Sequence, residues 1–192
     1  MLLRIRLIST MMAANDNQKG KTMLKQFTKA GMALAIALPM LMSTQAVANE
    51  LTVNIEIPKI PVAEYHRPYV GVWIEGEGVK QNLAVWYQLD RDGEDWLKDI
   101  RQWWRKLGRS ETFPVDGVSG ATKAPGTHSL ILKEGTAPLG NLKPGKYTLY
   151  VEAAREVGGR ELLQIPFEWP STRSGEAQGK SELGKVSLTI SQ

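Results

Sequence analysis

The chain contains no cysteine among its 192 residues and only two histidines, His66 and His128. The absence of cysteine excludes disulfide bonds, thiolate metal sites, a thiol nucleophile and the lipidated cysteine of a bacterial lipoprotein. A nucleophilic serine or threonine needs an adjacent base, and two histidines far apart in sequence give little support for such a base or for a metal site. Without disulfide bonds or thiolate metal sites, the stability of the chain must come from its core.

Long apolar runs are also scarce. The apolar run Gly31 to Met42 (GMALAIALPMLM) is shorter than the about 20 residues that span a bilayer. Lys25 and Lys29 precede it, and Ala46-Val47-Ala48 follows it with the small residues of a cleavage site. This is the pattern of an export signal, so we expect cleavage after Ala48 and a soluble, periplasmic mature protein.

The basic surplus of the chain disappears when this segment is removed. Residues 1–48 hold six of the 24 Lys and Arg residues and one of the 20 Asp and Glu residues, which leaves 18 bases, 19 acids and a net charge of −1 for residues 49–192. The clustered basic face of a nucleic-acid-binding protein is therefore not indicated. The length of residues 49–192 predicts one domain with a single core.

Most of this part alternates apolar and polar side chains with a period of two, which is typical of strands with one buried face. The polar stretch 171–184 is interpreted as a mobile loop, and Pro144-Gly145 as a type II turn. Two hairpins are expected, one before Asn82 and one at Gly158-Gly159. The pattern predicts an antiparallel immunoglobulin-like β-sandwich, with a barrel as the alternative. The seven expected strands cover residues 51–57, 69–76, 82–89, 127–133, 146–154, 160–169 and 185–191.

One segment, Gly93 to Leu107, instead repeats apolar residues at helical spacing. Acidic residues open it, basic residues close it, and Gly108 can take the left-handed position that ends a helix. We expect an amphipathic helix inserted at the sandwich edge. One interpretation is that the tryptophans of this helix fill the core. The other is that Trp103 or Trp104 borders a ligand.

The stretch DGVSGATKAPG, Asp116 to Gly126, consists mainly of small residues. Gly117 and Gly120 permit backbone conformations and close approaches that a β-carbon would block. Ser119 and Thr122 supply hydroxyl groups among small neighbours. Such a loop can enter the active site of another protein and present Thr122 there.

The first seven residues of this stretch resemble the D-x-x-[S/T]-G-A-T acceptor motif for covalent FMN, found in FMN-carrying subunits of sodium-pumping quinone reductase and related electron-transport complexes. The resemblance implies that a periplasmic FMN transferase uses FAD and a divalent metal to esterify Thr122 with the FMN phosphate. It implies recognition of Asp116, Ser119, Gly120 and Ala121. The alternative is an ordinary glycine-rich turn in which Asp116 or Ser119 binds its own backbone.

The remainder of residues 49–192, including PYVGVWIEG and LKPGKYTLYVEAAREVGGRE, resembles an uncharacterised family of predicted bacterial periplasmic proteins. That resemblance implies a secreted β-rich domain. The usual FMN-binding domain is not recognisable outside the acceptor motif.

Two other segments contain residue types that could bind a ligand. The D-x-D-G at Asp90 lacks the twelfth-position glutamate of a calcium-binding EF-hand loop, since that position is Arg101, and its acids are better explained as a helix start. The segment Glu64 to Pro68 (EYHRP) offers aromatic, imidazole and guanidinium groups that a flavin could use, but an exposed loop is the favoured interpretation.

Two hypotheses follow for function. In the first, the chain is a periplasmic electron carrier with FMN on Thr122, loaded by an FMN transferase and working between a membrane-bound reductase and another acceptor; the flavin would supply the redox chemistry, and no catalytic residues are needed. In the second, the chain is an exported binding or scaffold module without a cofactor.

Overall fold

The computed structural model describes residues 48–90 and 92–192. All but the last residue of the predicted export signal therefore lies outside the described residues. Within the described part, no helix is both long and apolar enough to cross a membrane.

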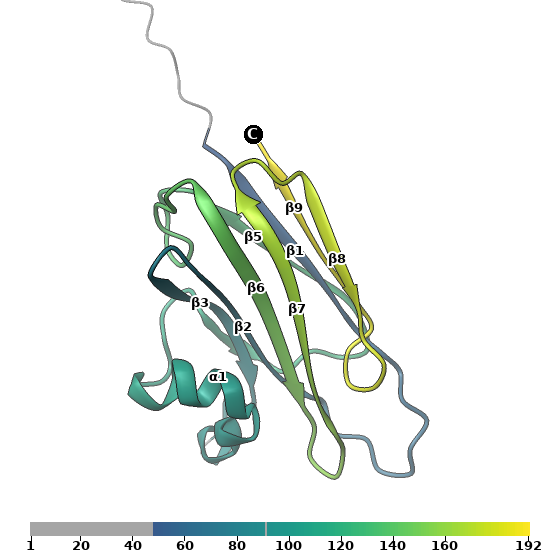
Figure 1. Cartoon of the computed structure of the whole chain (residues 1–192). Helices are drawn as coiled ribbons and strands as arrows, with labels where there is room; N and C mark the ends of the chain where they lie inside the picture. Colours follow the sequence, from purple (N-terminus) through teal and green to yellow (C-terminus); the bar gives the residue numbers. More distant parts are fainter. Residues whose placement is uncertain (1–47, 91) are drawn as a thin grey trace, which may run out of the picture. The chain divides into compact units, whose positions relative to one another are not determined.

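The described residues form nine strands in two facing sheets (Figure 1). One sheet has the strand order β5-β1-β9-β8 and the other the order β4-β3-β2-β6-β7. The predicted β-sandwich with one small helix is thus confirmed, and the barrel is excluded for this part of the chain. The strands are β1 (Glu50–Ile57), β2 (Tyr69–Gly76), β3 (Val79–Tyr87), β4 (Ser119–Ala121), β5 (Gly126–Lys133), β6 (Gly145–Ala154), β7 (Arg160–Trp169), β8 (Ser174–Gln178) and β9 (Lys185–Ser191).

The main core lies between the two sheets, and the period-two pattern explains how it forms. In β1, every second residue from Leu51 to Ile57 is buried, and the intervening polar residues are half-buried. Strand β2 differs because six consecutive residues, Tyr69 to Ile74, are buried. Its second face is covered by the helical segment, whose Leu97, Ile100 and Trp103 form a second apolar cluster with Trp73. The five-stranded sheet is therefore buried on both faces at its centre.

Both predicted hairpins are present. Strands β2 and β3 pair antiparallel across Glu77 and Gly78, which both have positive φ, and β6 and β7 pair antiparallel across Gly158-Gly159. The type II turn at Pro144-Gly145 is not present as predicted. Gly145 begins β6, and β5 and β6 belong to different sheets, so the chain crosses the sandwich between them.

Two short strands were not expected. Strand β8 lies inside the polar stretch interpreted as a mobile loop, and it pairs antiparallel with β9 at the edge of its sheet. An edge strand can be polar because one of its faces and one row of its backbone groups meet water. Strand β4 runs parallel to β3 and contains three residues of the DGVSGAT motif.

The single helix predicted over 93–107 is wrong in detail. The segment is a 3-10 helix η1 (Gly93–Asp99), a break at Ile100, the helix α1 (Arg101–Lys106) and a second 3-10 turn, η2 (Gly108–Ser110). The break has a tertiary cause, because the fully buried Glu152 carboxylate accepts hydrogen bonds from the backbone N–H groups of Gln102 and Trp103 at 2.9 and 2.7 Å. These N–H groups would otherwise continue the preceding helix.

Gly108 does not take the expected left-handed conformation. It lies beneath two indole rings, and a Cβ at this position would approach Cζ3 of Trp103 to 2.5 Å and Cε3 of Trp104 to 2.7 Å. The glycine is needed for close packing rather than for a helix stop.

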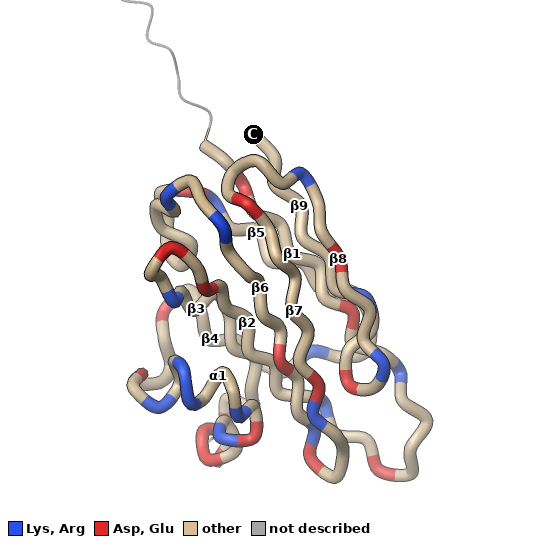
Figure 2. Tube along the Cα trace, in the orientation of Figure 1, with Lys and Arg blue, Asp and Glu red and all other residues tan. Residues whose placement is uncertain are grey.

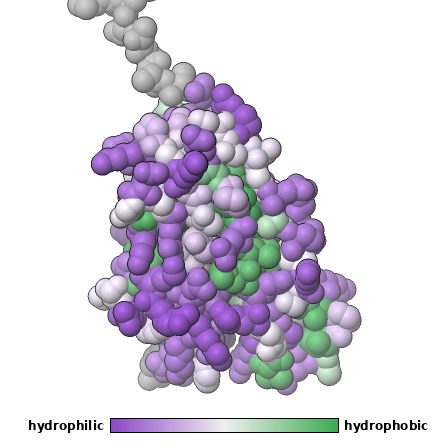
Figure 3. Space-filling model, in the orientation of Figure 1, coloured by the Kyte–Doolittle hydropathy of each residue, from purple (hydrophilic) through white to green (hydrophobic). Residues whose placement is uncertain are grey.

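The surface carries both charge signs, interspersed along the described chain (Figure 2). The face in Figure 3 is mostly hydrophilic, with a hydrophobic area over β7. This distribution agrees with the nearly balanced charge of residues 49–192.

Candidate functional site

The DGVSGAT motif is tied to the end of β3 by its backbone. The carbonyl of Val118 accepts a hydrogen bond from the N–H of Val85 at 2.9 Å, and the N–H of Thr122 donates to the carbonyl of Tyr87 at 3.1 Å. Gly117 has φ +69°, a left-handed conformation that glycine adopts without strain. The motif therefore has a defined conformation, with a turn at its start and an edge strand at its end.

The five predicted site residues lie along this segment but face different surroundings. Asp116 and Ala121 are exposed, whereas Ser119, Gly120 and Thr122 are half-buried. The hydroxyl oxygen of Ser119 accepts a hydrogen bond from the N–H of Val115 at 2.9 Å, so it stabilises the turn as the alternative interpretation described. Asp116, before β4, and Thr122, after it, line different surface depressions.

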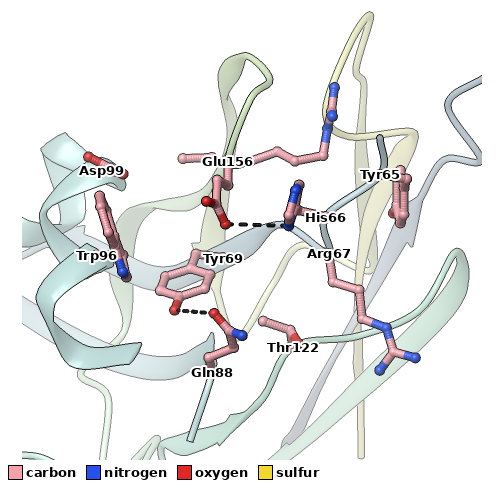
Figure 4. A pocket seen from close by; sticks show the side chains of 11 residues that line it. Tyr65, His66, Arg67, Tyr69, Gln88, Trp96, Asp99, Thr122 and Glu156 are labelled. Carbon is pink, nitrogen blue, oxygen red and sulfur yellow. Dashed lines mark hydrogen bonds and ion pairs between the residues drawn. The ribbon is translucent and has the colours of Figure 1, made fainter. Parts of the chain in front are cut away.

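Thr122 lines a cavity of about 210 Å³ (Figure 4). Its walls come from the loop before β2, the residue after β3, η1 and the end of β6. Within the described part of the chain, the Thr122 hydroxyl takes part in no hydrogen bond, although its backbone N–H does.

One wall of the cavity is aromatic. The hydroxyl of Tyr69 donates to the carbonyl of Gly93 at 3.0 Å and lies 3.3 Å from Oε1 of Gln88. The Tyr69 ring also packs edge-on against Tyr87, with ring centres 6.4 Å apart. Burial raises the pKa of Tyr69 above its ordinary value, so it stays a neutral hydrogen-bond donor. Trp96 of η1 stands beside this wall and remains 50% exposed.

The opposite part of the cavity is polar and carries the loop Glu64 to Pro68. The ring nitrogens of His66 lie 2.8 Å from a Glu64 carboxylate oxygen and 3.3 Å from one of Glu156. This arrangement links the loop to the β6–β7 hairpin. Figure 4 places the Arg67 side chain on the same side of Tyr69 as Thr122.

A buried ion pair lies at this part of the cavity, and one of its members, Arg155, lines the cavity. Nε of Arg155 donates to Glu182 at 2.9 Å, and both side chains are almost fully buried. The guanidinium carbon lies 5.8 Å from the centre of the Tyr65 ring. Burial raises the pKa of Tyr65. The pair therefore holds the base of the loop that carries His66 and Arg67.

The residue choices made from sequence were partly incomplete. Trp103 fills core, with its Nε1 donating to Oδ1 of Asn82 at 3.0 Å, and Trp104 lines a different depression from Thr122. The tryptophan of the helical segment that does line the Thr122 cavity is Trp96. The EYHRP segment, interpreted as an exposed loop, contributes Tyr65, His66 and Arg67 to the same cavity. Gln88 carried no sequence signal.

The chain belongs to the family described as predicted periplasmic protein (DUF2271), whose model matches residues 50–185. The expected periplasmic localisation and the membership of an uncharacterised periplasmic family are confirmed. No curated protein matches the chain. Among solved structures, human GIVD cytosolic phospholipase A2, in complex with methyl gamma-linolenyl fluorophosphonate, is similar at 9% identity and a TM-score of 0.30. That match covers 77% of this chain and 18% of the phospholipase chain, and at this TM-score it carries no argument about function.

Proposed function

We propose that this periplasmic protein is an electron carrier with FMN esterified to Thr122, working between a membrane-bound reductase and another acceptor. The observation that supports the proposal is the position of Thr122. The last residue of an FMN-acceptor-like motif lines a cavity that is also lined by three aromatic side chains, two arginines and a histidine.

The attachment step is a phosphoryl transfer carried out by a separate FMN transferase. The Oγ1 of Thr122 attacks the phosphorus of the FMN half of FAD, the pyrophosphate P–O bond breaks, AMP leaves, and a base of the transferase takes the hydroxyl proton. The chain therefore supplies an accessible hydroxyl and a segment that the transferase recognises. Exposed Asp116 and Ala121 and the edge position of β4 suit such recognition.

The residues around Thr122 fit a phosphodiester. The ester carries one negative charge, and Arg67 can donate hydrogen bonds to its oxygens from the exposed loop beside Thr122. The cavity is smaller than the roughly 300–1,000 Å³ of typical small-molecule sites, so part of the FMN would lie over its rim.

When bound, FMN supplies one- and two-electron transfer, and the chain's residues position it and modify its surroundings. A rim-exposed flavin suits a carrier, because electrons must pass to and from partner proteins at the surface. The residues of the cavity therefore have a binding and orienting role rather than a catalytic one.

The test is co-expression of the exported chain with an FMN transferase, followed by intact mass and in-gel flavin fluorescence. We expect a mass gain of one FMN less one water in the unmutated protein and none in Thr122→Val. The valine is nearly isosteric and keeps the backbone hydrogen bond to Tyr87. The matched control is Thr127→Val, at an exposed threonine of β5, which should be labelled fully.

An unmutated protein that stays unlabelled while a known acceptor is labelled by the same transferase contradicts the proposal. That result would favour the second function, an exported binding or scaffold module in which DGVSGAT is only a turn. Labelling that survives in Thr122→Val would place the ester on another residue.

A further inference from the structure

Trp96 is the side chain of this cavity that packing against the described residues does not explain. Its neighbours in the helical segment, Leu97, Ile100 and Trp103, are fully buried, whereas Trp96 keeps half of its surface in water. An exposed indole at the edge of a cavity leaves a large apolar and polarisable surface without a partner. Such a surface is typical of a site where a planar ligand packs.

The other aromatic side chains around the motif are poorly placed for this role. Trp86 and Tyr87 pair with β4 through their backbones, but their side chains are only 4% and 2% exposed. Tyr65 packs against the Arg155 guanidinium. Among the aromatic residues that line the cavity, Trp96 is 50% exposed and Tyr69 is 8% exposed, so Trp96 can offer a ring face to a ligand and Tyr69 only a small surface.

Tyr69 is held rigidly, and this makes it a suitable second wall. Its hydroxyl is fixed by Gly93, and its ring is supported from behind by Tyr87. In Figure 4, Trp96 and Tyr69 lie together on one side of the cavity, while Thr122 and Arg67 lie toward the other. A ligand anchored at Thr122 thus meets polar groups near its attachment point and aromatic groups farther away.

One face of the Trp96 indole already carries a cation, since Nζ of Lys98 lies 5.5 Å from its ring centre. A ligand stacked on Trp96 must therefore use the opposite face of the indole.

We propose that Trp96 and Tyr69 form the binding site for the flavin's isoalloxazine ring, with Trp96 stacked on the ring and Tyr69 bordering it. This inference rests on the proposed function, because the ring is brought to the site by the ester at Thr122. The isoalloxazine ring is planar and electron-poor, and the indole ring is electron-rich, so the two favour an offset stack. The ribityl chain joins the polar end of the cavity to the aromatic end.

The test compares the FMN-loaded protein with loaded Trp96→Leu, Trp96→Phe and the control Trp104→Leu. In a stack, the excited flavin takes one electron from the indole and returns it, and this quenches the emission. Removing the indole should lower the ratio of stacked to unstacked ring by roughly two- to tenfold, with a matching rise in flavin emission for Trp96→Leu. Trp104→Leu removes a half-buried indole outside the cavity and should leave the emission unchanged.

Iodide quenching separates stacking from electron donation. Trp96→Phe keeps an aromatic surface, so its flavin should emit more strongly yet stay as protected from iodide as in the unmutated protein. In Trp96→Leu the flavin should become more accessible to iodide. Far-ultraviolet circular dichroism verifies that each variant is folded.

The outcomes distinguish the two proposals. An adduct of correct mass whose emission and iodide protection are the same in Trp96→Leu and the unmutated protein overturns the ring site alone. An equal change in Trp104→Leu would do so too. Absence of the adduct from the unmutated protein overturns the proposed function and the ring site together.

Discussion

Replacement of Glu152 by alanine should loosen the helical segment that carries Trp96. The Glu152 carboxylate is fully buried and accepts hydrogen bonds from three donors: the N–H of Gln102 at 2.9 Å, the N–H of Trp103 at 2.7 Å and Nη1 of Arg160 at 2.6 Å. Alanine leaves two backbone donors of α1 and one guanidinium without this partner. The segment then loses the group that begins α1.

The magnitude follows from the kinds of bond that are lost. A hydrogen bond to a charged group contributes about 1.5–3 kcal/mol. Arg160 is 42% exposed, so loss of its partner adds little. Loss of the two bonds from backbone donors should lower the free energy of unfolding by about 3–5 kcal/mol. Domains are stable by only about 5–15 kcal/mol, so the loss is a large fraction of the total.

Urea unfolding followed by tryptophan fluorescence measures this change. With a slope of about 2 kcal/mol per M, the midpoint should fall by roughly 1.5–2.5 M. Glu152→Gln keeps one acceptor oxygen and should cost about half as much. The control is Glu176→Ala, which removes an exposed partner of Lys185 and should leave the midpoint unchanged within error. A loss below about 1 kcal/mol in Glu152→Ala would refute the reasoning, because a buried carboxylate with three donors would then contribute almost nothing.

Two further predictions concern ion pairs. Burial alone would raise the pKa of Glu75, but hydrogen bonds from Lys106 and Trp73 outweigh it and lower the pKa. The stability that this carboxylate contributes is present above its unfolded pKa and is lost as the pH falls through its folded pKa. Glu75→Gln should therefore flatten the acid side of a stability-versus-pH curve. A slope that Glu75→Gln leaves unaltered would be inconsistent with this assignment. Arg155→Met should cost about 3–5 kcal/mol, because it strands the buried Glu182 carboxylate, and adding Glu182→Gln should restore part of the loss in urea unfolding. If the double variant is no more stable than Arg155→Met, the pair is not coupled as described.

The sheets could be predicted from sequence because their patterns are local. Alternation from Leu51 to Ile57 and the glycine-containing hairpin turns identify strands without knowledge of the rest of the chain. Strand β8 could not be found in this way, since an edge strand without apolar alternation has the composition of a loop. The length of the helix was misjudged because a distant residue, Glu152, breaks it.

The candidate site shows the same division. Thr122 and its motif are contiguous in sequence and therefore visible there. The cavity around Thr122 joins the loop 64–68, Gln88 and Trp96, which are far apart in sequence and meet only through the pairing of β2, β3 and β6. Trp96 and Trp103 lie on the same helical pattern, so periodicity alone cannot tell which of them is buried. The break at Ile100, which the pattern does not reveal, changes their directions relative to each other.

The most direct measurement is peptide mass spectrometry of the protein purified from its native host. The account predicts that the peptide containing Asp116 to Thr122 carries one FMN, with fragment ions that locate the phosphoester on Thr122. The same peptide recovered without any modification, from cells in which an FMN transferase is active, would contradict it.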